Sequence, residues 1–149
     1  MKKRLAILLP IAAVVIAVFI YLLAARPWLI TKEPNTYEIN TEAPVVVVFE
    51  SFDNTCGDYR IINTGSEAVF CVNTFEIQCK KDGTWYKVKP ESPHDSQALS
   101  ELKQGENESY WTHWRIDGKS LPAGEYRLVT PIKPDSGGSY WVAAPFTVS

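Results

Sequence analysis

The sequence has little of the side-chain chemistry that most enzymes use. It holds two histidines, His94 and His113, and it contains neither a G-x-S-x-G nucleophile elbow nor an H-E-x-x-H zinc motif. His94 lies in a stretch rich in Pro and Ser, where a solvated side chain is expected, and His113 alternates with apolar neighbours. We therefore predict no catalytic residue, no cofactor and no enzyme activity.

Ligand patterns for metal ions are also missing. The three cysteines, Cys56, Cys71 and Cys79, include no C-x-x-C pair, and no aspartates have the D-x-[DN]-x-[DN]-G spacing of a calcium loop. No metal site is therefore predicted. Three is an odd number, so at most one internal disulfide can form, and the sequence leaves its pairing unknown. The alternative is that the thiols serve as small buried apolar groups.

A long apolar run near the N-terminus is the first positive feature. Leu5 to Ala25 carries no charged residue, and as a helix it would span about 31 Å, close to the ~30 Å of a bilayer core. A cleaved signal peptide, the alternative, usually has an apolar region of only about 7–15 residues. The run therefore predicts a transmembrane helix or signal anchor at residues 5–25.

The charges around this run predict its orientation. Residues 1–4 carry three basic side chains, and only Arg26 follows the run immediately, so residues 1–4 are expected in the cytoplasm and the rest outside. This gives a single-pass protein of the cell membrane. Beyond residue 30 the chain has 11 basic and 17 acidic residues, a formal net charge of −6. Such an acidic exterior argues against nucleic acid as a partner and against adhesion to anionic lipid or wall polymer.

The exported part reads as a linker followed by an all-β domain. Residues 26–43 are predicted to be a linker, and residues 44–149 show the period-two alternation of strands, separated by frequent turns. The predicted strands are 43–50, 57–62, 68–80, 84–90, 106–116, 125–132 and 139–148. Seven short strands with no convincing helix predict a seven-stranded immunoglobulin-like β-sandwich.

Three local expectations accompany this fold. Asp82-Gly83 suits a type I′ hairpin turn, and Gly65 is expected to supply a positive φ in the turn after residue 62. Residues 96–102, SQALSEL, are predicted to form at most about one turn of helix.

Several turns and core positions resemble a known family. The matching segments are YRIINTGSEAVFCVNTFEIQ, KKDGTWYKV, LPAGEYRLVTPI and YWVAAPFTV. They are similar, in the same order, to the bacterial Ig-like domain of Firmicute cell-surface proteins and lipoproteins, over about residues 45–148. Gln104-Gly105-Glu106 stands where that family usually has Pro-Gly-Glu, and no lipid-modifiable cysteine follows the apolar run. The resemblance implies a sandwich fold and carries over no catalytic residues.

Aromatic side chains are the only hint of a binding surface. In the stretch ESYWTHWR, alternation places Tyr110, Thr112 and Trp114 on one face, predicted to be buried, and Trp111, His113 and Arg115 on the other. The predicted exposed interaction patch consists of Trp111, His113, Arg115, Trp141 and Tyr86, provided that their strands are neighbours. The alternative is that these side chains shield sheet edges or pack under residues 90–104.

The sequence therefore predicts a membrane-anchored extracytoplasmic Ig-like domain that binds an unidentified protein or glycan. Leu5–Ala25 would be its contact with the membrane. A structural spacer or accessory subunit of a membrane complex is the alternative, and a small exported enzyme is a weaker one. Neither the partner nor the oligomeric state follows from the sequence.

Overall fold

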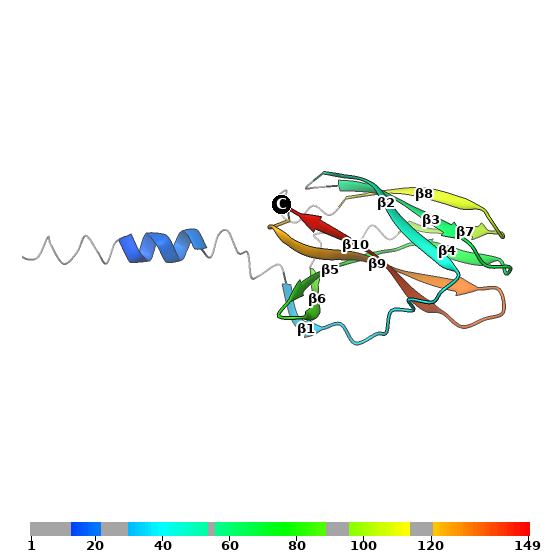
Figure 1. Cartoon of the computed structure of the whole chain (residues 1–149), viewed down its shortest axis with the longest axis horizontal. Helices are drawn as coiled ribbons and strands as arrows, with labels where there is room; N and C mark the ends of the chain where they lie inside the picture. Colours follow the sequence, from blue (N-terminus) through cyan, green and yellow to red (C-terminus); the bar gives the residue numbers. More distant parts are fainter. Residues whose placement is uncertain (1–12, 22–29, 54–55, 89–95, 114–120) are drawn as a thin grey trace, which may run out of the picture.

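The computed structural model describes residues 13–21, 30–53, 56–88, 96–113 and 121–149, and within them ten β-strands form two sheets (Figure 1). The strands are β1 (Ile30–Pro34), β2 (Val45–Asp53), β3 (Cys56–Asn63), β4 (Val69–Asn73), β5 (Glu76–Lys81), β6 (Thr84–Val88), β7 (Ser96–Leu102), β8 (Asn107–His113), β9 (Gly124–Pro134) and β10 (Tyr140–Val148). The larger sheet has the order β1-β6-β5-β9-β4-β7, with β10 also paired to β9, and the smaller has the order β2-β3-β8.

The core lies between the two sheets and consists of the inward-facing half of each strand. Tyr59 and Ile61 of β3 face Leu128 and Ile132 of β9, and all four side chains are fully buried. Alternate residues of β3 are buried along its whole length, as expected for a strand with one face on the core. The predicted all-β class and the predicted two-faced strands are therefore confirmed.

A tyrosine near the start of β9 has the bonding of a Greek-key sandwich. The Tyr126 hydroxyl donates a hydrogen bond of 2.8 Å to the carbonyl oxygen of Pro122, four residues upstream. This tyrosine corner is a hallmark of immunoglobulin-like domains, because it fixes the connection that enters the strand. The segment LPAGEYR, predicted as a turn followed by a strand, thus forms both.

The predicted single strand 68–80 is in fact two strands that lie end to end. β5 pairs with residues 126–129 of β9 and β4 with residues 132–134, so both lie along the same edge of β9. Between them the chain bulges by two residues opposite Pro131, which has no N–H to donate to a ladder. Because two is an even number, the side-chain alternation continues unchanged across the break. The residues predicted to share a face, Val69, Cys71, Phe75, Ile77 and Cys79, all pack into the core or against it.

Residues 96–102 form β7, so the prediction of a helical turn there is wrong. The segment pairs antiparallel with β4, from Leu102 opposite Val69 to Ser96 opposite Asn73. Its Ala, Leu and Glu content favours a helix, but the unpaired edge of β4 offers backbone hydrogen bonds that a single helical turn lacks.

The Asp82-Gly83 turn is confirmed, with positive φ at both residues (50° and 81°). The prediction for Gly65 is wrong, because its φ is not positive. A Cβ on Gly65 would instead lie 2.9 Å from the Cβ of Pro44. Glycine is needed at position 65 because the ring of Pro44 lies too close to leave room for a side chain.

Residues 13–21 form a helix whose side chains are all exposed. They are the only part of the predicted 5–25 membrane run that the structure describes. Among the described residues, no helix is both long and apolar enough to cross a bilayer.

Asn63, at the end of β3, joins three segments through its buried side chain. Its amide nitrogen donates to the carbonyl oxygens of Glu67 (2.7 Å) and Leu102 (2.9 Å), and its amide oxygen accepts from the N–H of Gly65 (2.9 Å). Leu102 belongs to the larger sheet and Asn63 to the smaller one. The side chain therefore connects the two sheets at one end of the sandwich.

We expect Asn63→Ala to lower the free energy of unfolding by about 3 kcal/mol, since three hydrogen bonds are lost and a buried carbonyl is left unpaired. Asn107→Ala, at an exposed position of β8, should change it by less than about 0.5 kcal/mol. Urea unfolding of the two variants measures the difference, and equal effects would show that Asn63 does not hold the sheets together.

None of the three cysteines, which all lie in the described part of the chain, is in a disulfide. Cys71 and Cys79 are buried, as the sequence allowed, and Cys56 is half-buried. Burial, together with the nearby Glu108 carboxylate, raises the pKa of Cys71 to about 12, and burial also raises the pKa of Cys79. Both thiols therefore stay protonated in the folded protein at neutral pH.

These pKa values predict a loss of stability at alkaline pH. In the unfolded chain a thiol ionises from about pH 8.5, whereas Cys71 in the folded protein holds its proton until about pH 12. The free energy of unfolding should therefore fall as the pH rises above about 8.5. Urea unfolding at a series of pH values should show a shallower fall for Cys71→Ala than for the wild type. Parallel profiles would contradict the assignment.

Candidate functional site

Residues 30–40, which were predicted to belong to a linker, are docked on the larger sheet. β1 pairs with the edge strand β6, with Ile30 opposite Val88 and Pro34 opposite Tyr86 (Figure 1). The register shifts between these two pairs. The prediction of a linker up to residue 43 is therefore wrong for this part, because unpaired backbone on β6 captures the segment.

After β1 the chain crosses the outer face of the larger sheet as a segment that we call the strap, residues 35–40. The N–H of Asn35 donates to the carbonyl oxygen of Trp85 on β6 (2.9 Å), and the N–H of Asn40 donates to that of Trp141 on β10 (2.8 Å). Two strands at opposite sides of the sheet therefore fix the two ends of the strap.

Tyr37, at the middle of the strap, makes the main side-chain contacts between the strap and the larger sheet. Its ring stacks on the indole of Trp141 with a centroid distance of 4.2 Å and an interplanar angle of 15°. Its hydroxyl donates to the Glu76 carboxylate and accepts a 3.0 Å hydrogen bond from the Gln78 amide. Burial, and then the hydrogen bond and negative charge of Glu76, raise the pKa of Tyr37. This phenol is therefore neutral and serves as a hydrogen-bonding group.

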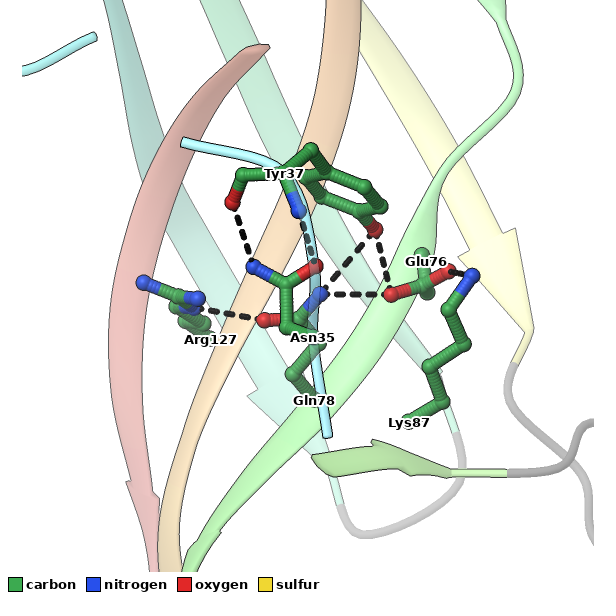
Figure 2. Close-up of polar contacts among 6 residues, drawn as sticks. All are labelled: Asn35, Tyr37, Glu76, Gln78, Lys87 and Arg127. Carbon is green, nitrogen blue, oxygen red and sulfur yellow. Dashed lines mark hydrogen bonds and ion pairs between the residues drawn. The ribbon is translucent and has the colours of Figure 1, made fainter. Parts of the chain in front are cut away.

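The polar groups under Tyr37 bind one another in a continuous network (Figure 2). The Gln78 amide donates to Glu76 (2.5 Å) and accepts from Nε of Arg127 (2.8 Å), while Lys87 forms a 2.6 Å ion pair with Glu76. The Arg127 guanidinium also lies 4.3 Å from the ring centroid of Trp85. The network contains no activated nucleophile. Its arrangement is suited to holding the strap.

Burial on the outer face shows that the strap acts as a third layer. Val129 lies opposite Glu76 in the register of β5 and β9, so it points away from the core, and it is not a member of the core cluster. It is nevertheless fully buried, as is Gln78. A sheet residue can be buried on its outer face only if something covers it, and the strap crosses the sheet at this level. The strap therefore covers the outer face of the larger sheet over β5 and β9.

The outer face of the smaller sheet has no such cover among the described residues. Trp111 is 59% exposed, and Val46 and Val48 are 44% and 42% exposed. Arg60 and Glu50 form an ion pair between these apolar side chains. The members of this surface, which we call the Trp111 face, are Val46, Val48, Glu50, Asp58, Arg60, Ser109 and Trp111, related by the β2-β3-β8 register and by side-chain contacts.

The structure does not bring the predicted patch together, because the condition that its strands are neighbours is not met. Trp111 is on β8 of the smaller sheet and Trp141 on β10 of the larger one, so their outward side chains lie on opposite faces of the sandwich. Tyr86 packs against the core, opposite Cys79 in the register. The prediction that Tyr86 faces outward is therefore wrong.

The remaining predicted positions are only partly described. The backbone of His113 pairs with that of Cys56 at the end of β8. Arg115, Trp114 and His94 lie outside the described residues. Tyr110 and Thr112 are buried and Trp111 is exposed, so the predicted alternation holds over the described part of ESYWTHWR.

Sequence reasoning missed the strap and its network. The signal was present in the sequence as the alternation of Tyr37 and Ile39 with polar residues, and the structure shows these two side chains half-buried and the polar residues next to them exposed. Glu76 and Gln78 are polar residues on the outward side of β5, where Gln78 is fully buried. The pairing of these two patterns depends on which strands are adjacent, and the sequence does not give that.

The two tryptophans are expected to respond differently to truncation. Trp141→Ala should lower the free energy of unfolding by about 2 kcal/mol, because it removes the stack under Tyr37 and half-buried apolar area. Trp111→Ala should change it by less than about 1 kcal/mol, since an exposed side chain loses little packing. Thermal or urea unfolding compares them. A large loss with Trp111→Ala would make that residue structural and leave the Trp111 face without its main contact group.

Comparison with known proteins agrees with the fold. The family model described as "Bacterial Ig-like domain" matches residues 37–147, from the centre of the strap to the end of β10. None of the curated proteins compared with the chain matches it significantly.

Solved structures give only distant likenesses. The structural-genomics target SoR45 has 16% identity over 75% of this chain and 89% of its own, with a TM-score of 0.49. The putative ApaA protein from Bordetella pertussis has 19% identity over 78% of this chain and 97% of its own, with a TM-score of 0.46. Beta-glucosidase 3B from Thermotoga neapolitana has 22% identity over 76% of this chain but only 18% of its own, with a TM-score of 0.32. Likenesses at this level say nothing about function.

Proposed function

We propose a binding role at the cell surface for this chain, which belongs to the bacterial Ig-like domain family. In this proposal the chain is anchored in the cell membrane through Leu5–Ala25, with residues 1–4 in the cytoplasm and the Ig-like domain outside. The domain binds a protein or a wall glycan. It performs no catalysis.

The observation that carries the binding role is the difference between the two outer faces. The strap covers the outer face of the larger sheet over β5 and β9, whereas the Trp111 face leaves three large apolar side chains exposed around an ion pair. Contiguous exposed apolar surface marks interaction sites more often than other surface, and Trp and Arg are enriched among the residues that dominate binding energy. The Trp111 face is therefore the surface proposed to meet the partner.

Membrane anchoring is supported by the helix at residues 13–21. Its apolar side chains, among them Val14, Phe19 and Tyr21, are more than half exposed. A helix that is apolar on all sides is stable only where apolar surroundings cover it. The uncharged run of residues 5–25 around it has the length of a bilayer span.

Photo-crosslinking from the full-length chain in its own cell envelope tests the binding role. Trp111 replaced by p-benzoylphenylalanine should give a discrete adduct, because the side chain would then lie against the partner. Leu99 is the matched control, since it is also 59% exposed but lies on β7 of the larger sheet, and the same replacement there should give none. Mass analysis of the adduct tells protein from glycan. No adduct at 111, or equal adducts at both positions, would reject the Trp111 face.

A second comparison addresses the accessory-subunit alternative. Exchange of residues 5–25 for an unrelated anchor should leave the Trp111 adduct intact if the domain makes the contact. Loss of the adduct on this exchange would favour a subunit that recognises its partner through the helix.

A further inference from the structure

The docked N-terminal segment shortens the tether between the proposed membrane helix and the domain. The sequence assigned residues 26–43 to a linker, but β1 pairs with β6 from Ile30 onward, and the strap is hydrogen-bonded at Asn35 and Asn40. Only residues 26–29 separate the apolar run, which ends at Ala25, from the first docked residue.

The length of this tether limits where the domain can be. From Ala25 to Ile30 is five residue steps, which span about 18 Å at most when fully extended. If the segment were undocked as far as Val45, twenty steps would separate the helix from the sandwich, with a maximum of about 70 Å and a coil average of about 25 Å. Docking therefore decides whether the domain stays at the bilayer surface or moves far from it.

The strand register shows which part of the domain this short tether holds. Ile30 lies beside Val88, at the end of β6 away from the β5–β6 hairpin turn, and β1, β6 and this hairpin lie together at one end of the sandwich (Figure 1). The 11-residue strand β9 runs from this end to the opposite one, where residue 135 bonds residue 68 and residue 105 bonds residue 63. We call the first the β1 end and the second the far end.

We infer that the docked segment of residues 30–40 holds the β1 end of the sandwich at the phospholipid headgroup surface, so that the domain stands end-on to the membrane. The inference rests on the proposed membrane anchor and adds how the domain is mounted on it. The partner of the β1 end is the headgroup layer of the bilayer that holds the helix.

End-on mounting agrees with the difference between the two faces of the sandwich. With the β1 end toward the bilayer, both outer faces stand away from lipid. The Trp111 face then stays open to a partner, although the tether is short. The strap helps to keep the N-terminal segment docked, because its release requires the loss of the Tyr37–Trp141 stack and of the hydrogen bonds that join Tyr37 to Glu76 and Gln78.

Energy transfer from the domain to the membrane tests the inference on the full chain. The chain, with Cys56→Ser, is reconstituted into phosphatidylcholine nanodiscs that contain an acceptor-labelled headgroup. A donor is attached at Thr84→Cys at the β1 end or at Gln104→Cys at the far end, both exposed positions. Cys71 and Cys79 are buried with raised pKa values and label poorly. Transfer should be at least about twofold higher from position 84, because β9 spans about 36 Å.

Two further variants test the role of docking. A ten-residue Gly/Ser insert between Leu29 and Ile30 leaves the domain untouched and adds about 17 Å of average span, so transfer from position 84 should fall by at least about half. Tyr37→Ala should lower it as well, because the loss of the strap contacts leaves β1 held by β6 alone, whereas Glu38→Ala, exposed on the same strap, should not.

The outcomes separate the inference from the proposed function. If the chain floats with lipid vesicles but positions 84 and 104 transfer equally, or if the insert changes nothing, the end-on mounting is wrong and the membrane anchor stands. If the chain does not float with vesicles, the anchor and the mounting are both wrong.

Discussion

The buried side chain of Asn63 is the contact on which the two-sheet arrangement depends. The sheets share no backbone ladder, and at this end of the sandwich Asn63 bonds both Glu67 and Leu102 on the side of the larger sheet. Its own backbone groups bond Glu106 and Gly105 in the next connection. An amide side chain can serve this purpose because it donates and accepts at once. The core packs in register because these connections are fixed relative to one another.

The strap gives the domain two unlike faces. It covers the larger sheet over β5 and β9, so that three successive residues of β9, Leu128 to Thr130, are all buried. The smaller sheet keeps the ordinary alternation of one buried and one exposed face. Trp141 therefore lies inside a three-layer contact, whereas Trp111 lies on an exposed face. In the proposed function, the exposed face binds the partner and the covered face serves attachment.

The proposed membrane attachment and the proposed binding of a partner use different surfaces of the domain. The segment that leads from the proposed membrane helix docks on β6 and on the outer face of the larger sheet, while the Trp111 face belongs to the smaller sheet. Glu76 is hydrogen-bonded to Tyr37 of the strap and to Gln78. These contacts stabilise the docking of the strap, and in the proposed arrangement the domain is a rigid element between the membrane and the partner.

The sequence by itself determined the strand class, the inward and outward alternation and the Asp82-Gly83 turn, because each depends on neighbours one to four residues apart. It could not determine that residues 96–102 form a strand, since only the free edge of β4 overrides their helical preference. Nor could it show that Gly65 is required by contact with Pro44 rather than by its φ. The predicted patch failed for the same reason. Parity shows which residues of a strand share a face, but the tertiary structure decides that Tyr86 faces the core and that Trp111 and Trp141 lie on different sheets. The strap was hidden because its partners, such as Tyr37 and Glu76, are about forty residues apart.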